Sequence, residues 1–460
     1  MAHNHWLEQS LTTIHAALRE GRLRARDLAE AAISVRETNP AAGSAYRQAE
    51  PQLTRQASDF TDAILAKGDD PGPLAGLPLS IKDMYGVPGY TTWAGSPRAL
   101  PAQWEQPGPV VEAALHQGAV VTGKTHTVEF AFGGLGVNEH HGTPINPHDS
   151  TDHRVPGGSS SGAGVSVATG SALLALGTDT AGSVRVPASM TGVAGLKTTR
   201  GRWSTRGLVP LSSTLDSLGL MARRVEDLIF AFKALDPALT GGLHADTVPF
   251  GPATALRLGV PADFFCNDCS PGVNEAFEGS LQRFAAAGIE LVRVELPGTE
   301  EAWELFRTGG LAAPELVGFL QRELPEWLDT LDTRVALRIR GVDTLTATEY
   351  LQRCALQQRL AAAANERFYG TGAVDALLTP TVPLTPPRLT DVTSEADYAR
   401  CNLLALRNTV MVNLMDLCAV TLPAGKDMTG MPVGLQVIAG TGADAKALHI
   451  GGMLERVLGG

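Results

Sequence analysis

The 460-residue chain lacks three features that mark large classes of proteins. Its five cysteines are an odd number in a long chain, so they indicate no disulfide framework. Basic residues are not in excess, because the formal net charge is −11, whereas nucleic acids and anionic membranes select clustered Lys and Arg. A long apolar run is also missing: residues 163–176 contain Ser, Thr and Gly and are too short to span a bilayer. We therefore expect neither a nucleic-acid partner nor a membrane partner.

Two further features favour a cytoplasmic location. The first residues, MAHNHWLEQS, show no charged segment followed by an apolar stretch, so no secretory signal is visible. Cys266 and Cys269 form a C-x-x-C pattern, but no second pair accompanies it, and the surrounding FFCNDCSPG predicts a turn. We expect these cysteines to be structural thiols rather than a redox or zinc site.

The order of apolar patterns predicts an α/β protein. Apolar residues at helical spacing across 7–36 predict a pair of N-terminal helices. Between about 74 and 225, short β-branched runs alternate with Gly/Ser/Pro loops and small-residue helices, which favours a largely parallel sheet covered by helices. Later elements are predicted as a strand–helix–strand unit at 254–296, strands at 373–383 and 432–439, and a helix from about 443.

We expect one structural unit with two regions. Residues 1–70 are predicted to form an N-terminal helical region packed on the core, and residues 71–460 are predicted to form the main domain. The charged helical pattern at about 300–370 predicts an excursion from that domain. No linker, low-complexity tract or repeat divides the chain, which favours a single unit.

Two short patterns match known motifs but lack the structural context that those motifs need. Residues 118–125, GAVVTGKT, satisfy the phosphate-loop pattern, yet Ala-Val-Val-Thr favours an extended strand and no clear helix follows. Residues 158–162, GSSSG, satisfy G-x-S-x-G, which would make Ser160 the nucleophile of an α/β-hydrolase-type esterase. In that motif the serine lies on a sharp turn that follows a strand, whereas the preceding residues here, NPHDSTDHRVPG, predict a loop. Nucleotide binding is not expected, and the esterase remains a remote alternative.

Three separated segments carry polar residues that packing does not explain. Leu79–Asp83 places Lys82 on an apolar strand, where a lysine is either a surface residue at the sheet edge or a functional one. Residues 155–164, VPGGSSSGAG, form a Gly/Ser loop that opens a small-residue helix, which alone would indicate a capped turn. Residues 176–187, LGTDTAGSVRVP, end a strand in small residues around Ser183. Successive backbone N–H groups in such a turn can converge on one anion, as an oxyanion hole requires.

Together these segments resemble one known family. IKD at 81–83, PGGSSSG at 156–162 and GTDTAGSVRVP at 177–187 are similar to the signature of the amidase signature family of Ser–Ser–Lys hydrolases. The 24-residue step from Ser159 to Ser183 agrees with the spacing of that family. The resemblance covers most of the chain and is weakest between about 225 and 370. It implies an α/β fold with a central mixed sheet flanked by helices on both faces, and hydrolysis of a linear amide C–N bond through an acyl-enzyme.

The resemblance implies a role for each residue of the triad. Ser183 is the nucleophile, and Ser159, held by a cis peptide bond, relays its proton to a neutral Lys82. Burial lowers the pKa of a lysine, so Lys82 must be enclosed to act as this base. The backbone N–H groups of Thr180, Ala181, Gly182 and Ser183 correspond to the oxyanion hole. No cofactor and no metal are implied, and His140 and His141, which lack partners at metal-ligand spacing, are predicted loop residues.

The resemblance also implies supporting and substrate-lining residues. Hydrogen bonds that brace the site are expected from Asp83, Ser160, Asp179, Arg185 and Asp216. The stretch that lines the acyl or amine pocket is expected at Glu129, Phe130, Ala131, Phe132 and Gly133, together with Gly158.

Several functions remain open within and outside this family. The small-molecule amide substrate is unspecified, and two alternatives are an allophanate hydrolase-like ureido-acid hydrolase and the glutaminase component of a tRNA-dependent amidotransferase. The first usually carries a second domain, and the second usually has GGSIRQP where this chain has GSVRVP. A non-catalytic scaffold would be expected to lack a triad residue, and none is missing. A homodimer is compatible with the resemblance, because many relatives are dimers.

Overall fold

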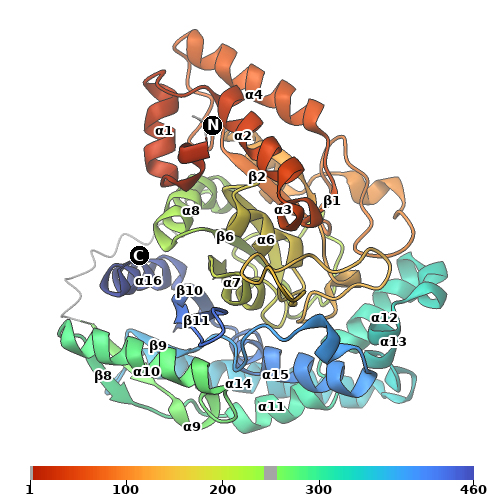
Figure 1. The fold of residues 1–460 in the computed structure, drawn as a ribbon. Coiled ribbons are helices and arrows are strands. Elements are labelled where there is room, and N and C mark those ends of the chain that lie inside the picture. The colour runs from red at the N-terminus through yellow and green to blue at the C-terminus, as the bar shows by residue number, and fades with distance from the viewer. Residues whose placement is uncertain (1–3, 243–255, 460) are drawn as a thin grey trace.

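Eleven strands of the computed structural model, which describes residues 4–242 and 256–459, form one sheet in the order β1-β3-β2-β4-β6-β5-β10-β11-β9-β7-β8 (Figure 1). The strands are β1 Tyr46–Gln48, β2 Pro78–Lys82, β3 Val120–Thr125, β4 Leu174–Asp179, β5 Ala194–Lys197, β6 Ser217–Ala222, β7 Arg257–Val260, β8 Glu290–Arg293, β9 Ala376–Pro380, β10 Cys418–Lys426 and β11 Pro432–Ala439.

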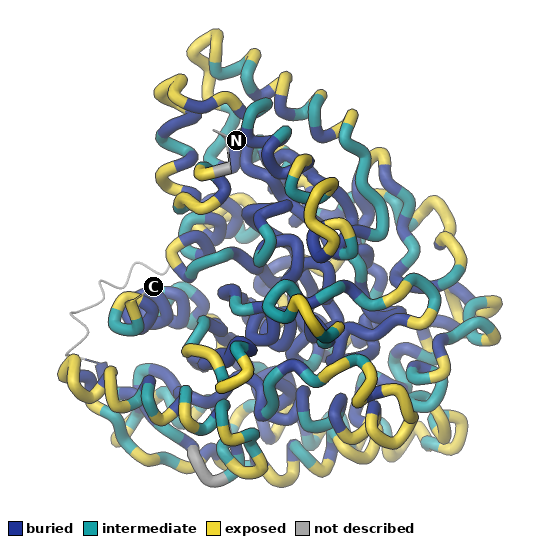
Figure 2. The backbone as a smooth tube through the Cα atoms, in the orientation of Figure 1, coloured by how far each residue is buried: buried dark blue, intermediate teal, exposed yellow. Residues whose placement is uncertain are grey.

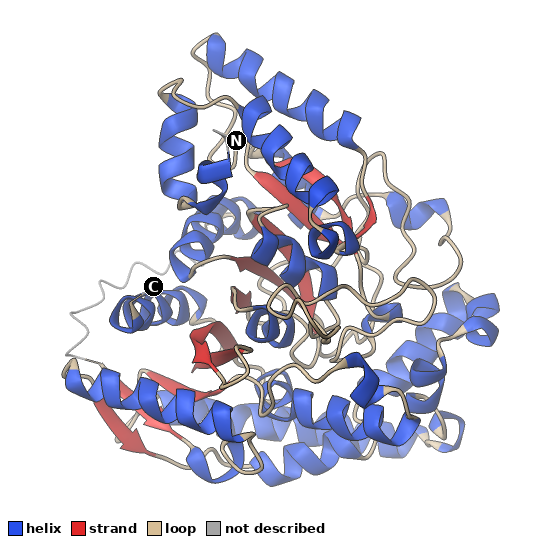
Figure 3. Ribbon diagram, viewed as in Figure 1, coloured by secondary structure: helices blue, strands red, loops and turns tan. Residues whose placement is uncertain are grey.

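Helices flank this sheet (Figure 3). They are α1 Leu11–Arg19, α2 Ala25–Thr38, α3 Pro40–Ser44, α4 Pro51–Ala66, α5 Pro109–His116, α6 Ser161–Thr169, α7 Arg185–Thr191, α8 Val225–Thr240, α9 Ala262–Phe265, α10 Pro271–Ala286, α11 Thr299–Arg307, α12 Ala312–Glu323, α13 Thr333–Arg338, α14 Ala347–Asn365, α15 Glu395–Leu414 and α16 Asp444–Leu458. The α/β fold with a mixed sheet and helices on both faces is therefore confirmed.

The sheet is more antiparallel than the helix–strand alternation predicted. Strand β2 pairs in parallel with β3 and β4, and β7 pairs in parallel with β8 and β9. The central pairs β4–β6, β6–β5, β5–β10, β10–β11 and β11–β9 are antiparallel. Parallel strands need a long crossover, whereas antiparallel strands can follow a short turn. Strands β10 and β11 are joined by such a turn, and no helix separates β5 from β6. The prediction of a largely parallel sheet was wrong for this central part.

The parallel pairing of β2 with β4 determines where the candidate site lies. Leu79 pairs with Leu174 and Ile81 with Leu176, so the two strands run side by side and end at the same edge of the sheet. All residues of both strands are buried, in the dark interior seen in Figure 2. Lys82 is the last residue of β2, and the turn that contains Ser183 follows β4. The topology therefore brings two of the three signature segments together.

The N-terminal region and the late elements agree with most of the sequence pattern. The N-terminal helices are present, but β1 also joins the main sheet by pairing with β3. The division of the chain at residue 70 stays a prediction. The expected late strands correspond to β9 and β11, the final helix to α16, and the helical excursion to α11–α14, whereas β10 was missed. No helix in the described ranges combines the length and apolar character needed to cross a membrane.

Candidate active site

Lys82 is fully buried and reaches two hydroxyl groups. Its Nζ donates to Ser159 Oγ at 2.7 Å and to Thr178 Oγ1 at 2.6 Å. Thr178 lies on β4 beside the end of β2, so the strand pairing itself supplies the second contact. Burial lowers the pKa of Lys82 to about 7, although the nearby carboxylates of Asp216 and Asp179 oppose this shift. The neutral form of Lys82 is therefore accessible near neutral pH.

Ser159 contacts this lysine, and its neighbour Ser160 contacts the loop that carries Ser183. The Gly158–Ser159 peptide bond is cis, and Ser159 is fully buried. The backbone N–H of the next residue, Ser160, donates to the carbonyl of Ser183 at 3.2 Å, which joins the two serine loops directly. The Ser160 hydroxyl instead points to the carbonyl of Thr178 at 3.4 Å. Ser159 is thus the serine that contacts Lys82, and Ser160 contacts the backbone.

The turn around Ser183 is braced by a buried ion pair. Arg185 donates to both carboxylate oxygens of Asp179, from Nε at 3.0 Å and from Nη2 at 2.8 Å, and both side chains are fully buried. Burial acts to raise the pKa of Asp179, but Arg185 outweighs it and holds that pKa well below its usual range. Asn413 adds a hydrogen bond to Asp179 at 3.0 Å. The ion pair joins β4 to α7, and the Asn413 contact joins both to α15.

One of the four expected oxyanion-hole donors is already engaged. The Gly182 N–H donates to Asp179 Oδ1 at 2.9 Å, so it supports the turn instead of facing the cavity. The amides of Thr180, Ala181 and Ser183 donate to no protein acceptor in the described part of the chain, and these three residues line the cavity. Three of the four predicted donor amides are therefore without a protein acceptor, and the assignment of the oxyanion hole stays a prediction.

Glycine is required at position 182 by its surroundings. Its φ is +125°, and a Cβ there would overlap the hydroxyl of Thr409. That hydroxyl donates to the carbonyl of Ala181 at 2.7 Å, so α15 holds the turn through this contact. Thr409 was missed at the sequence level, because nothing near it in the chain indicates this contact.

Asp216 supports the same turn by a hydrogen bond to Thr180. It accepts a hydrogen bond from the Thr180 hydroxyl at 2.6 Å and from the amides of Leu211 and Ser212 at 3.0 Å each. Burial raises the pKa of Asp216 to about 6, and these hydrogen bonds counteract part of that shift. The side chain positions Thr180 and the 211–212 loop at the cavity wall.

Asp83 is paired with a lysine from the segment that matches the phosphate-loop pattern. Lys124 lies on β3, its Nζ is 2.7 Å from Asp83 Oδ1, and both side chains are buried. Lys124 also donates to the Thr92 hydroxyl at 2.7 Å. The GAVVTGKT segment is therefore a strand whose lysine, Lys124, points inward. Asp83, which follows Lys82 in the sequence, neutralises the charge of Lys124. Lys124 is a supporting residue to which the sequence patterns assigned no role.

The expected lining stretch divides into two parts. Ala131, Phe132 and Gly133 line a cavity of about 330 Å³ together with Ser183. Glu129 and Phe130 are fully buried behind them, and Gly158 packs against Gly136, where a Cβ would lie 2.6 Å from the Gly136 amide nitrogen. Burial raises the pKa of Glu129 to about 8, partly offset by the Asp332 amide, which donates to it at 2.5 Å.

The remaining wall of the cavity comes from the helical excursion and α15. Residues of these elements that line it include Arg307, Arg334, Arg338, Tyr398 and Asn402. None of them belongs to a recognisable motif, and sequence patterns gave no signal for them. The local pattern indicates only that this region is helical and charged.

No metal centre is formed by the described residues, among which no group of three or more His, Cys, Asp or Glu is arranged to hold an ion. His140 is a loop residue, with its Nε2 3.4 Å from Glu129 Oε1. Cys266 and Cys269 form no disulfide bond within the described part of the chain. Cofactor independence stays a prediction.

Comparison with known proteins shows the family. A model of the family described as Amidase matches residues 27–448. The chain belongs to the amidase family. It is 51% identical over 416 residues to a 2-amino-5-chloromuconic acid deaminase of Comamonas testosteroni, covering 90% of this chain and 89% of that protein. It is 32% identical over 486 residues to a mandelamide hydrolase of Pseudomonas putida, covering 99% and 92%.

A solved structure agrees with the fold over nearly the whole length of this amidase. A crystal structure described as that of an amidase superposes with a TM-score of 0.86 at 31% sequence identity, covering 97% of this chain and 99% of that one. The protein is thus an amidase-type hydrolase of carbon–nitrogen bonds. The allophanate-hydrolase and glutaminase alternatives are activities of the same family, and the general amidase interpretation stands.

Proposed function

We propose that this amidase releases ammonia from a small carboxylic acid, using Ser183 as nucleophile, Ser159 as proton relay and Lys82 as base. The observation that supports these roles best is the contact from the buried Lys82 Nζ to Ser159 Oγ at 2.7 Å, beside a cavity that Ser183 lines. A serine hydroxyl needs a base close by to become nucleophilic. A lysine with a pKa of about 7 can supply that base at neutral pH.

The reaction begins with proton transfer away from Ser183. Neutral Lys82 accepts the Ser159 proton, Ser159 accepts the Ser183 proton, and Ser183 Oγ adds to the sp² carbon that bears nitrogen. The three cavity-facing amides of Thr180, Ala181 and Ser183 stabilise the negative charge that develops on the oxygen of an amide substrate. The relay then returns the proton to nitrogen, the C–N bond breaks and ammonia leaves.

Water completes the cycle by the reverse path. Its proton passes through Ser159 to Lys82 while its oxygen adds to the carbon, and the bond to Ser183 then breaks. An amide gives a carboxylate and ammonia. A 2-amino-dienoic acid reacts as its protonated imine tautomer: Ser183 Oγ adds to the C=N carbon, and its proton passes through the relay to nitrogen. Ammonia then leaves as a lone pair of Ser183 Oγ forms a C=O bond to that carbon. Water adds to the same carbon, and collapse of the hemiketal returns the proton to Ser183 and gives a 2-oxo acid.

The substrate class follows from the relative and from the cavity. The 51% identical protein is named as a deaminase of 2-amino-5-chloromuconic acid, which is a six-carbon dicarboxylic acid with nitrogen on C2. The cavity volume of about 330 Å³ suits a small molecule, and its wall carries three arginines. We therefore propose an amino-substituted dicarboxylic acid of the muconic type as the substrate class.

The test is ammonia release from 2-aminomuconic acid and its 5-chloro derivative, with mandelamide and glutamine as comparison substrates. Wild-type protein is expected to prefer the amino-dicarboxylic acids, and the Ser183→Ala variant to lose turnover. Equal or faster turnover of mandelamide or glutamine would reject the proposed substrate class. Turnover that survives in Ser183→Ala would reject the proposed nucleophile.

The oligomeric state and the cellular location of this amidase remain predictions. Members of this family act on small-molecule amides, and some assemble with other subunits. A homodimer is proposed from the family resemblance, and a cytoplasmic location stays a prediction.

A further inference from the structure

The cavity beside Ser183 has an excess of positive charge in its wall. Arg307, Arg334 and Arg338 line it, and the exposed Glu395 is the acidic residue among the lining residues. The three arginines come from α11 and α13, whose sequences belong to the part of the chain least similar to the family signature. Such a wall attracts an anionic ligand.

Two of the three arginines are already paired with carboxylates. Arg307 is exposed and donates to both oxygens of Glu304 at 2.7–3.0 Å. Arg334 lies 3.4 Å from Glu139. Arg338 has no carboxylate within 4.0 Å among the described residues. The uncompensated charge of the wall is therefore that of Arg338.

Arg338 is held in place with most of its donors unused. Its guanidinium lies 3.8 Å from the centroid of the Phe132 ring, and Nη1 donates to the Phe132 carbonyl at 2.9 Å. The other guanidinium N–H groups have no protein acceptor in the described ranges. Burial lowers the pKa of Arg338 to about 10, although the residue is only partly buried. A carboxylate is the partner that a planar guanidinium fits best.

Two further donors lie in the same wall. Tyr398 and Asn402 are one turn apart on α15, so they share a face of that helix. The Tyr398 hydroxyl makes no hydrogen bond within the described chain. Asn402 accepts a hydrogen bond from the Gly134 amide at 2.7 Å through Oδ1, which leaves its NH2 group as a donor. Neither donor is among the enclosed side-chain atoms without a partner, and both residues line the cavity, so a ligand in the cavity can reach both donors.

We propose that Arg338, Tyr398 and Asn402 form a carboxylate-binding subsite that holds the acid end of the substrate while Ser183 attacks the carbon that bears nitrogen. This proposal rests on the proposed function, because it places the carboxylate in the cavity that Ser183 lines. In this proposal, residues of α13 and α15 select the substrate, and residues of the family signature carry out the reaction.

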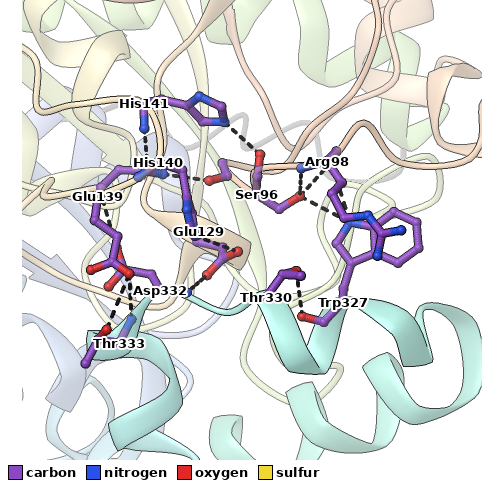
Figure 4. Close-up of polar contacts among 12 residues, drawn as sticks. Ser96, Arg98, Glu129, Glu139, His140, His141, Trp327, Thr330, Asp332 and Thr333 are labelled. Atoms are coloured by element: carbon purple, nitrogen blue, oxygen red, sulfur yellow. Dashed lines mark hydrogen bonds and ion pairs between the residues drawn. The ribbon is translucent and has the colours of Figure 1, made fainter.

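The segment that begins α13 is anchored to the loop that carries Phe132. The Asp332 amide donates to Glu129 Oε2 at 2.5 Å, and the Asp332 carboxylate accepts from the amides of Glu139 at 3.0 Å and Arg334 at 2.9 Å. Figure 4 shows Asp332 between Glu129 and Glu139. These contacts fix α13 relative to residues 129–139, so Arg338 is positioned before a ligand arrives.

Equilibrium binding tests the subsite without requiring turnover. Calorimetry would measure cis,cis-muconate and its dimethyl ester binding to the Ser183→Ala protein. The diacid is expected to bind at least tenfold more tightly than the ester. Adding Arg338→Met should weaken diacid binding by about 10- to 100-fold, the usual effect of losing a charge-assisted hydrogen bond, and leave ester binding within threefold. Arg340→Met removes the same charge from an exposed position two residues away and should change neither.

Conservative variants separate binding from folding. Tyr398→Phe and Arg338→Lys are expected to weaken diacid binding by about 3- to 30-fold while the melting temperature stays close to that of the parent protein. Equal binding of diacid and ester, or equal effects of Arg338→Met and Arg340→Met, would overturn the subsite. A failure of the Ser183 mechanism would instead show as turnover in the Ser183→Ala protein, and diacid binding would be unaffected by it.

Discussion

Lys82 donates from Nζ to Ser159 Oγ at 2.7 Å in a site where both side chains are fully buried. The lysine is thereby separated from water but remains in contact with the group that it must deprotonate. Asp83, its neighbour in sequence, is paired with Lys124 and does not neutralise it. This arrangement supports the proposal that Lys82, a residue type ordinarily found as a surface cation, acts as a base.

The first prediction concerns pH. The pKa of Lys82 is lowered to about 7, and only the neutral amine accepts a proton, so kcat/KM should rise as pH increases through about 7. Below that value it should fall by about tenfold per pH unit. The measurement is a pH–rate profile from 5 to 9 with a substrate that does not titrate in that range. A profile that is flat between pH 5 and 7 would exclude Lys82 as the base.

The second prediction separates the adjacent serines. Ser159→Ala removes the hydroxyl between Lys82 and the nucleophile and should reduce kcat by about 10²- to 10⁴-fold, the usual contribution of general acid–base catalysis. Ser160→Ala removes a 3.4 Å contact to a backbone carbonyl and should cost less than about tenfold. Steady-state kinetics of both variants decide the assignment. The reverse order of effects would favour the esterase-type elbow centred on Ser160.

The third prediction concerns the buried ion pair behind Ser183. Arg185→Met leaves the Asp179 carboxylate buried without its cation, which should lower the free energy of unfolding by about 3–5 kcal/mol. Arg200→Met breaks a more exposed pair with Asp416 and should cost under about 1 kcal/mol. Urea unfolding of the two variants gives the comparison. Similar losses would show that the Asp179–Arg185 pair is not a principal support of the turn.

The fourth prediction concerns the backbone of the nucleophile turn. Gly182→Ala would place a methyl group against Thr409 and disturb the adjacent amides, so kcat should fall by about 100-fold or more. Gly201→Ala is the matched control, because Gly201 also has a positive φ, +77°, but nothing lies within 4 Å of its Cβ position. That control should retain activity. Comparable kcat values for both variants would contradict the proposed role of the turn.

Sequence patterns indicated the strand and the turn that carry the candidate catalytic residues, but only some of the other residues that surround the site. The strand that ends at Lys82 and the small-residue turn at 180–183 were visible because strand periodicity and Gly/Ser turns are local properties. The mixed character of the central sheet was not visible from helix–strand alternation, because pairing is decided by connections such as the β10–β11 turn. The resemblance to the family supplied that part.

Contacts between distant segments could not be predicted. Lys124 meets Asp83, and Thr409 meets Ala181, although each pair is far apart in the sequence. The Gly182 amide is used by Asp179 because of the conformation of the turn, which its composition does not reveal. Arg338 reaches the cavity from a helical region without any motif. Each of these positions depends on tertiary packing and not on local pattern.

The most direct test of the central claim is covalent labelling of the nucleophile by a fluorophosphonate, which phosphonylates activated serines, followed by peptide mass spectrometry. We expect one adduct, on Ser183, that forms in wild type and in Ser160→Ala, slows strongly in Lys82→Ala and is absent in Ser183→Ala. An adduct on Ser160 or Ser159, or labelling of Ser183 at an unchanged rate without Lys82, would contradict it.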